Sequence, residues 1–237
     1  MRINPEKCVG CMKCVPFCGS EAILEKEKKC SIDEQKCVEC YVCFKSGICA
    51  FNAFEEIPLA WPRSLRHTFS SVGGTHKQTG TSGRGTAEMK TNDVTGRYQL
   101  GEVGFTVDVG RPGLGTTFHE VEKISMAIAE IGVEFEPLNP TTKLMVEGHP
   151  GRFRDDIKTE RILSCIIEFK TEEAKLISVI NTLRDVAKTI NTVFSVGCIS
   201  RCKPDGTIPI KAALDEADIF FRPNGKVNIG LGRPSAP

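Results

Sequence analysis

The cysteines of this chain are concentrated near its N-terminus, in a pattern that occurs twice. Nine of its 12 cysteines lie in the first 49 residues. Each group has three cysteines separated by two residues, followed by a later fourth: Cys8, Cys11, Cys14 and Cys18, then Cys37, Cys40, Cys43 and Cys49. The first cysteines of the two groups are 29 residues apart. Thiols this closely spaced either pair as disulfides or bind metal, and either use fixes the local fold.

The bulk properties favour metal binding over disulfides. The 237-residue chain has no run of 18 apolar residues that would span a membrane, and its start, MRINPEKCVGC, lacks the apolar core of a signal peptide. We therefore expect a cytoplasmic protein in a reducing compartment, where disulfides are rare. The net charge of +1 gives no overall attraction to nucleic acid or to a membrane surface.

The repeated CxxCxxC pattern with a trailing cysteine resembles the bacterial ferredoxins that carry two [4Fe-4S] clusters, over residues 1–57. In that family the fourth cysteine of each group binds the other cluster. The resemblance implies that one cluster is bound by Cys8, Cys11, Cys14 and Cys49, and the other by Cys37, Cys40, Cys43 and Cys18. It also implies that neither half folds without iron.

The chain departs from the family pattern in two ways. The proline that follows the fourth cysteine is replaced by Gly19 in one copy and by Ala50 in the other, and five residues rather than three precede Cys49. The alternative of a zinc site fits less well, because zinc sites use CxxC pairs separated by a dozen or more residues. Cys30 lies outside both copies, and we expect it to be a buried structural cysteine.

Residues 58–100 form a basic bridge that is rich in glycine, serine and threonine. Seventeen of these 43 residues are Gly, Ser or Thr, and six are Lys or Arg against two acids. Three interpretations remain open: an anion site at the glycine-rich segment 80–86, a strap that docks a partner, and a plain linker. The candidate contact residues for an anion or a partner are Arg84, Lys90 and Arg97.

Residues 101–237 have the periodicity of a mixed domain. The pattern predicts strands at 104–109, 133–137, 161–169 and 192–198, and helices at 116–132 and 172–191. The buried face predicted for the first helix comprises Phe118, Val121, Ile124, Ile128 and Ile131. For the second helix it comprises Leu176, Ile180, Leu183, Ala187 and Ile190. The βαββαβ order predicts a split-βαβ sandwich, so the fold class of the whole chain is α+β.

The segment 104–198 resembles an ACT-type regulatory domain, weakly. That resemblance implies a small-ligand loop at Gly113 or Gly115, although many such domains bind nothing. Asn224 and Gly225 predict a terminal hairpin. Two helices can cover only one face of the predicted sheet, so we expect a homo-oligomer that covers the other face, with the bridge as the alternative cover.

The remaining cysteines do not predict a third metal site. Cys165 and Cys198 share strand faces with apolar residues and are expected in the core, and their spacing to Cys202 is not distinctive. No hydrolytic motif is present in the sequence.

The sequence thus predicts an anaerobic iron–sulfur protein or oxidoreductase subunit that passes single electrons to or from a partner enzyme. An electron-transfer component is favoured over a stand-alone catalyst, and whether the chain is itself an enzyme stays open. Two alternatives remain: a redox-linked small-molecule sensor, and a subunit of a substrate-binding anaerobic redox enzyme.

Overall fold

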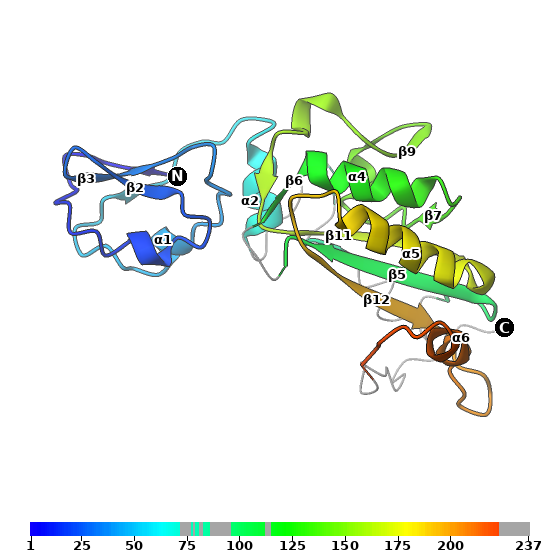
Figure 1. Ribbon diagram of the computed structural model, residues 1–237. Helices are drawn as coiled ribbons and strands as arrows, with labels where there is room; N and C mark the ends of the chain where they lie inside the picture. The colour runs from blue at the N-terminus through cyan, green and yellow to red at the C-terminus, as the bar shows by residue number, and fades with distance from the viewer. Residues whose placement is uncertain (72–76, 78, 81–82, 86–95, 112–114, 223–237) are drawn as a thin grey trace.

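The computed structural model describes residues 1–71, 77, 79–80, 83–85, 96–111 and 115–222. Lys90, Gly113 and the predicted hairpin at 224–225 lie outside the described residues. Within them the chain mixes helices and strands, which confirms the α+β class. Two lobes are joined through helix α2, Ser64–Ser70 (Figure 1). No helix among the described residues has the length and apolarity needed to cross a membrane.

The N-terminal lobe is built from very short elements around a small core. Its strands are β1 (Arg2–Ile3), β2 (Ile23–Lys26), β3 (Lys29–Ile32) and β4 (Phe54–Glu55), with the 3-10 turn η1 (Val15–Phe17) and helix α1 (Val42–Lys45). Strand β1 pairs antiparallel with β4, and β2 pairs antiparallel with β3. The buried core comprises Met1, Cys14, Ile23, Cys30, Tyr41 and Phe54. So small an apolar core gives this lobe little stability of its own.

The C-terminal lobe contains a four-stranded antiparallel sheet. Its strands are β5 (Glu102–Val109), β7 (Glu134–Phe135), β11 (Cys165–Glu172) and β12 (Phe194–Ser200), in the order β12-β5-β11-β7. Helices α4 (Phe118–Ala129) and α5 (Leu176–Ala187) lie on one face of the sheet (Figure 1). Along the chain these elements follow one another as strand, helix, strand, strand, helix, strand.

Smaller elements complete this lobe. The further strands are β6 (Thr116–Thr117), β8 (Met145–Val146), β9 (His149–Phe153) and β10 (Arg161–Ile162). The further helices are the 3-10 turns η3 (Thr142–Leu144), η4 (Asp155–Ile157) and η5 (Glu173–Lys175), and helix α6 (Ile210–Glu216). The sequence did not predict the β8–β9 hairpin, α2 or α6.

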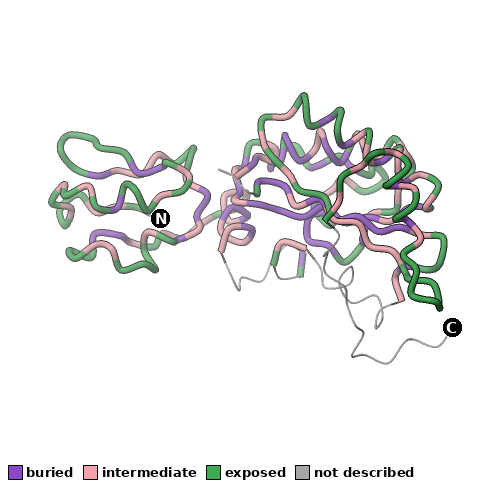
Figure 2. The backbone as a smooth tube through the Cα atoms, turned by 60° about the horizontal axis from the view of Figure 1, so that its bottom comes forward, coloured by how far each residue is buried: buried purple, intermediate pink, exposed green. Residues whose placement is uncertain are grey.

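The main core lies between the sheet and the two helices. Alternation along β5 turns Val103, Phe105, Val107 and Val109 towards the helices, and all four are fully buried. The rings of Phe105 and Phe169, on paired strands, stack with centroids 5.0 Å apart. Buried backbone follows β5, β11 and the inner sides of the helices, whereas the N-terminal lobe is largely exposed (Figure 2).

The predicted face of helix α4 is confirmed. Its residues Phe118, Val121, Ile124 and Ile128 are fully buried, and Ile131 packs against the core. Thr117 caps the helix, since its Oγ1 accepts a hydrogen bond from the Glu120 N–H at 3.4 Å.

The predicted face of helix α5 was partly wrong. The buried residues are Leu176, Val179, Leu183 and Val186, whereas Ala187 is exposed. The predicted Ile180 and Ile190 are partly buried and pack against the core, although the helix ends at Ala187 and Ile190 lies beyond it.

The single strand predicted at 161–169 was also wrong. Strand β10 pairs with β6, and β11 begins only at Cys165, so Leu163 and Ser164 form a break. At this break the backbone of residues 162–163 approaches two glycines closely. A Cβ on Gly110 would lie 2.7 Å from the Leu163 oxygen, and one on Gly115 would lie 2.5 Å from the Ile162 oxygen. The close approach bends the chain from one sheet to another.

The described parts of residues 58–100 pack as part of the C-terminal lobe. Leu65 and Phe69 of α2 are buried in the main core. On the sheet face opposite the helices, Gly85 contacts Ile166, and the ring of Tyr98 lies where a side chain on Gly104 would be. These segments therefore cover part of the face that the two helices leave open.

We expect Phe105→Ala to destabilise the C-terminal lobe by about 3–5 kcal/mol, because it leaves a cavity and removes the stack on Phe169. The control is Met126→Ala on the exposed side of α4, which should cost about 0.5 kcal/mol or less. Urea unfolding followed by fluorescence measures both, since Trp61 packs against this core and is the only tryptophan. Equal losses for the two variants would contradict the central place of the stack.

Candidate metal centre

The two CxxCxxC loops repeat in backbone conformation as well as in sequence. Gly10 and Met12 of the first loop have φ of 71° and 58°, and the positions 29 residues later, Glu39 and Tyr41, have φ of 53° and 60°. Left-handed residues at these points curl a loop so that its N–H groups can face a common anion. The duplication therefore extends to three-dimensional structure.

The first loop lies at the end of the lobe that is remote from α2. Gly10 approaches the turn between β2 and β3 so closely that a Cβ would lie 2.0 Å from the Lys28 oxygen. The backbone N–H of Cys30 donates to the Cys8 sulfur at 3.4 Å. Although burial acts to raise the pKa of Cys8, the backbone N–H groups of Cys30 and Gly10 lower it below its usual value. The loop thus favours an anionic sulfur at Cys8, whereas burial raises the pKa of Cys14.

Cysteines from both groups line one small cavity in this part of the lobe. Its volume is about 20 Å³, and its cysteines are Cys8, Cys11, Cys14, Cys30 and Cys49. Apolar walls are supplied by Ile3, Val9, Ile48, Phe51 and Phe54. Cys49, the trailing cysteine of the second group, therefore lies with the triplet of the first. We call Cys8, Cys11, Cys14 and Cys49 the outer site.

Cys18, the trailing cysteine of the first group, lies near the triplet of the second group. Burial is the main reason that the pKa of Cys43 is raised to about 12, and the nearby thiols of Cys40, Cys37 and Cys18 contribute to the same shift. Burial also raises the pKa of Cys40, and Cys18 adds to that shift. The charge of Cys18 therefore acts on two members of the second triplet. We call Cys37, Cys40, Cys43 and Cys18 the inner site.

The two trailing cysteines have equivalent surroundings. The Ala22 N–H donates to the Cys18 sulfur at 3.2 Å, and the Ala53 N–H donates to the Cys49 sulfur at 3.4 Å. In each copy the donor lies four residues after the cysteine. All eight cysteines are free thiols. Sets of four thiols with backbone N–H donors match the ligands and hydrogen bonds of a [4Fe-4S] cluster, so these residues fit that group.

Cys30 is buried, as the sequence predicted, and it also lines the cavity of the outer site. Its sulfur lies 3.5 Å from that of Cys14 and 3.3 Å from that of Met12. Burial and contact with Cys14 raise the pKa of Cys30 to about 12. No CxxC spacing marks this residue. The available signal is the repeat itself, because Cys30 and Met1 are 29 residues apart and both are buried in the same core.

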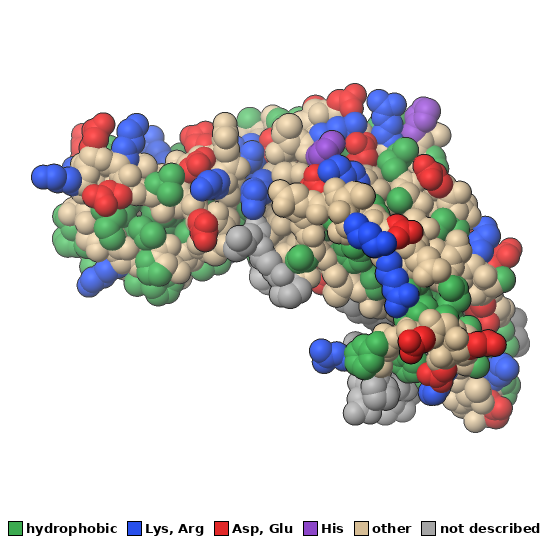
Figure 3. Space-filling model, in the orientation of Figure 1, with side chains coloured by type: hydrophobic (Ala, Val, Ile, Leu, Met, Phe, Trp, Pro, Cys, Tyr) green, Lys and Arg blue, Asp and Glu red, His purple; other side chains and the backbone are tan. Residues whose placement is uncertain are grey.

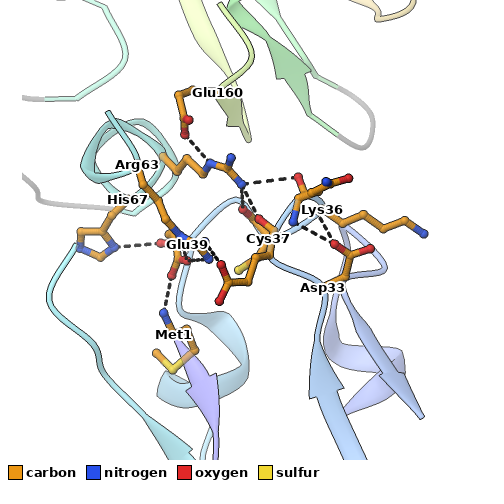
Figure 4. A network of polar contacts seen from close by, with 11 residues as sticks. Met1, Asp33, Lys36, Cys37, Glu39, Arg63, His67 and Glu160 are labelled. Atoms are coloured by element: carbon orange, nitrogen blue, oxygen red, sulfur yellow. Dashed lines mark hydrogen bonds and ion pairs between the residues drawn. The ribbon is translucent and has the colours of Figure 1, made fainter. Parts of the chain in front are cut away.

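The inner site is next to the C-terminal lobe, and side chains from the start of α2 contact its loop (Figure 4). Glu39, between Cys37 and Cys40, is fully buried and accepts hydrogen bonds from Arg63 at 2.6 and 3.0 Å. The ammonium group of Met1 donates to the same carboxylate at 2.7 Å. His67 donates through Nδ1 to the Glu39 carbonyl at 2.8 Å. Sequence reasoning missed these contacts, because α2 was read as part of a bridge.

The candidate contact residues that the structure describes, Arg84 and Arg97, contact side chains of the C-terminal lobe. Arg84 donates to Asp108 at 3.1 Å and to Ser164 at 2.6 Å, and Arg97 is paired with Glu136 at 3.0 Å. These arginines attach the described bridge segments to the sheet. Their role as anion or partner contacts stays a prediction.

Of the candidate ligand loop the structure describes Gly115, and the role of this loop stays a prediction. Gly115 has φ of 90° and lies against the backbone at Ile162. Cys165 is buried, Cys198 is half-buried and Cys202 is exposed. Among the residues that the structure describes, no group of three or more His, Cys, Asp or Glu side chains is arranged to hold a single metal ion.

Large apolar side chains are exposed on the N-terminal lobe. Figure 3 shows them gathered on the lower side of this lobe in that view. The exposed apolar residues in the cysteine-rich part include Val9, Phe17, Val42, Phe44 and Phe51. Exposed apolar surface of this kind is typical of contact with another molecule.

The comparison with known proteins identifies the N-terminal segment. Residues 1–24 match the family of 4Fe-4S binding domains. No curated protein and no solved structure matches the chain. The segment is thus of ferredoxin type and indicates [4Fe-4S] binding, and it supports a general role in iron–sulfur electron transfer.

We expect Gly10→Ala to impair iron loading of the outer site, because its Cβ would collide with the Lys28 backbone. Gly47→Ala is the matched control: Gly47 also has positive φ, at 65°, but no atom lies within 4 Å of its added Cβ. After anaerobic reconstitution, Gly10→Ala should retain about half of the wild-type iron and sulfide, and Gly47→Ala nearly all. An equal loss of iron in both variants would show that the strain of a positive φ, and not the contact with the Lys28 backbone, impairs loading.

Proposed function

We propose that the chain carries two [4Fe-4S] clusters, one at the outer and one at the inner site, and passes single electrons to or from a partner oxidoreductase. The observation that carries this proposal is the cavity in which Cys49 joins Cys8, Cys11 and Cys14. Four thiols drawn from both copies are the ligand set that a crossed two-cluster ferredoxin requires. Residues 1–57 would form the cluster-binding domain.

The residues of the chain would hold, insulate and orient the clusters. When bound, the clusters supply one-electron transfer. The N–H groups of Cys30, Ala22 and Ala53 stabilise the negative charge on their cysteine sulfurs. The apolar walls of the outer site limit contact with water, and the exposed apolar surface around it offers a partner a place to approach.

The departures from the family pattern are compatible with this proposal. Gly19 and Ala50 replace the usual prolines, yet both copies keep the N–H donor four residues after the trailing cysteine. The two extra residues of the second copy lie in a segment where α1 ends and Gly47 turns the chain. Because the loop absorbs the insertion there, Cys49 can still reach the outer site.

The C-terminal lobe would serve docking, assembly or sensing. We propose residues 58–100 as a bridge and 101–237 as an ACT-like split-βαβ domain. Both the anaerobic setting and the cytoplasmic location stay predictions. The homo-oligomer also stays a prediction, although the bridge covers part of the sheet face for which a second copy was expected.

The small-molecule alternatives have one observation in their favour. A cavity of about 270 Å³ lies at the β7 edge of the sheet, lined by charged and aromatic side chains that include Arg97, Tyr98, Glu136, Phe169 and Lys170. Its volume is close to the lower limit for a small-molecule site. The charged groups at its rim are already paired with one another, as Arg97 is with Glu136, so the cavity does not indicate a ligand class.

We expect about eight iron and eight acid-labile sulfide ions per chain after anaerobic purification, as two [4Fe-4S] clusters. Metal analysis together with electron paramagnetic resonance of the reduced protein measures this, because two reduced clusters in one small lobe should couple magnetically. Stoichiometric zinc, or iron for one cluster only, would falsify the two-cluster proposal.

We expect Cys18→Ala to lose the inner cluster and Cys49→Ala to lose the outer cluster, each with about half of the iron. Alkylation followed by mass spectrometry distinguishes them, since bound thiolates are protected. In Cys18→Ala the reactive thiols should be Cys37, Cys40 and Cys43, and in Cys49→Ala they should be Cys8, Cys11 and Cys14. The reverse pattern would show that each group binds its own cluster.

A further inference from the structure

Arg66 of helix α2 lies buried between the two lobes. Its Nη1 donates to the carbonyl oxygens of Glu34 at 2.7 Å and Cys37 at 2.9 Å, and more weakly to that of Gln35 at 3.4 Å. Its Nε donates to the Glu160 carboxylate at 2.5 Å. The guanidinium group therefore connects the loop that carries the first cysteine of the inner site to the C-terminal lobe.

The contact is well shielded from solvent at both ends. The side chains of Arg66 and Glu160 are each 10% exposed. A charge pair this shielded interacts more strongly than an exposed pair. Glu160 follows η4 and precedes β10, and its own N–H is hydrogen-bonded to the Ile157 oxygen at 2.9 Å. The position of Arg66 is thus determined by the C-terminal lobe.

Arg66 contacts the loop of the inner site, and Glu160 contacts Arg66. Arg66 donates through Nη1 to the Cys37 carbonyl and through a different nitrogen, Nε, to the Glu160 carboxylate, so Glu160 reaches that carbonyl only through Arg66. The charge of Arg66 therefore acts on the inner site from closer range than the opposing charge of Glu160. Removing one or the other should shift the electrostatic potential at the inner site in opposite directions.

Further charged groups near this loop pair with one another, while Asp33 accepts hydrogen bonds from the backbone N–H groups of Gln35 and Lys36. Arg63 binds Glu39 and Glu34, and the Met1 ammonium group binds Glu39. These ion pairs form a second network on the same loop. Replacing Arg66 or Glu160 would leave this network in place. The outer site lies beyond the β2–β3 hairpin, where its loop contacts Lys28 and Cys30. It therefore serves as an internal reference that Arg66 does not touch.

We propose that Arg66 is a positioning residue that fixes the Cys37 loop and couples the reduction potential of the inner cluster to Glu160 of the C-terminal lobe. This inference rests on the proposed two-cluster function. Reduction adds negative charge to the inner site, which Arg66 stabilises and Glu160 opposes. Whatever displaces Glu160 from Arg66 therefore changes the inner potential, and reduction of the inner cluster changes the strength of that contact by the same free energy.

The test is a redox titration of the full-length, iron-loaded protein, followed by electron paramagnetic resonance. The inner signal is identified as the one missing from Cys18→Ala. Arg66→Gln should lower the inner midpoint potential, with about a tenfold change in the equilibrium constant for reduction, or about 59 mV for one electron. Glu160→Gln should raise it. The outer potential should stay constant in both variants, as should both potentials in the control Arg84→Gln.

A purely structural role of Arg66 predicts a different result. Loosening the loop by either substitution would shift the inner potential in the same direction, and that outcome, or no shift, overturns the inference. If Arg66→Gln fails to load iron, Glu160→Gln alone decides: a raised inner potential supports the inference, and an unchanged or lowered one overturns it. A wild-type protein without an inner signal would instead refute the proposed two-cluster function.

Discussion

The N-terminal lobe depends on its cysteines, because it contains little else that could hold it together. Its strands are two to four residues long, and its core has six buried residues, two of which are themselves cysteines. A lobe of this size with so small a core is marginally stable, and a crosslink or a bound metal would stabilise it. Under the proposed function, the crossed placement of Cys18 and Cys49 would supply such a crosslink, since each cluster would join both copies of the repeat. On this view, iron is part of the fold as well as part of the chemistry.

The C-terminal lobe has a conventional core, and much of it could be predicted from periodicity. Alternation along β5 and helical spacing along α4 both marked the buried face correctly. Helix α5 was harder because Val179 and Ile180 are adjacent and both pack against the core, so its apolar face is wider than one helical stripe. The break before Cys165 could not be predicted, because it depends on Gly110 and Gly115, which are distant in sequence.

The cysteine sites show the same division between local and distant information. Spacing predicted eight cysteines as cluster ligands and the family resemblance predicted the crossed sets, and both stay predictions. Spacing could not reveal Cys30 or Arg66, because both reach their positions through tertiary contacts with other parts of the chain. Composition was a poor guide to residues 58–100 for a related reason. These residues have the composition of a linker, whereas Leu65 and Phe69 are buried in the core of the C-terminal lobe.

The two CxxCxxC loops of the repeat have different surroundings, as one pair of equivalent positions shows. Gly10 and Glu39 occupy the same place in the two loops and share a left-handed backbone. At the first, the neighbouring strand turn leaves no room for any side chain, and at the second a buried carboxylate binds Arg63 and Met1. The two halves of the repeat are therefore not equivalent: a side chain at position 10 would collide with the Lys28 backbone, and loss of the side chain at position 39 would remove a contact with the start of helix α2. Exchanging residues between the halves would not be neutral.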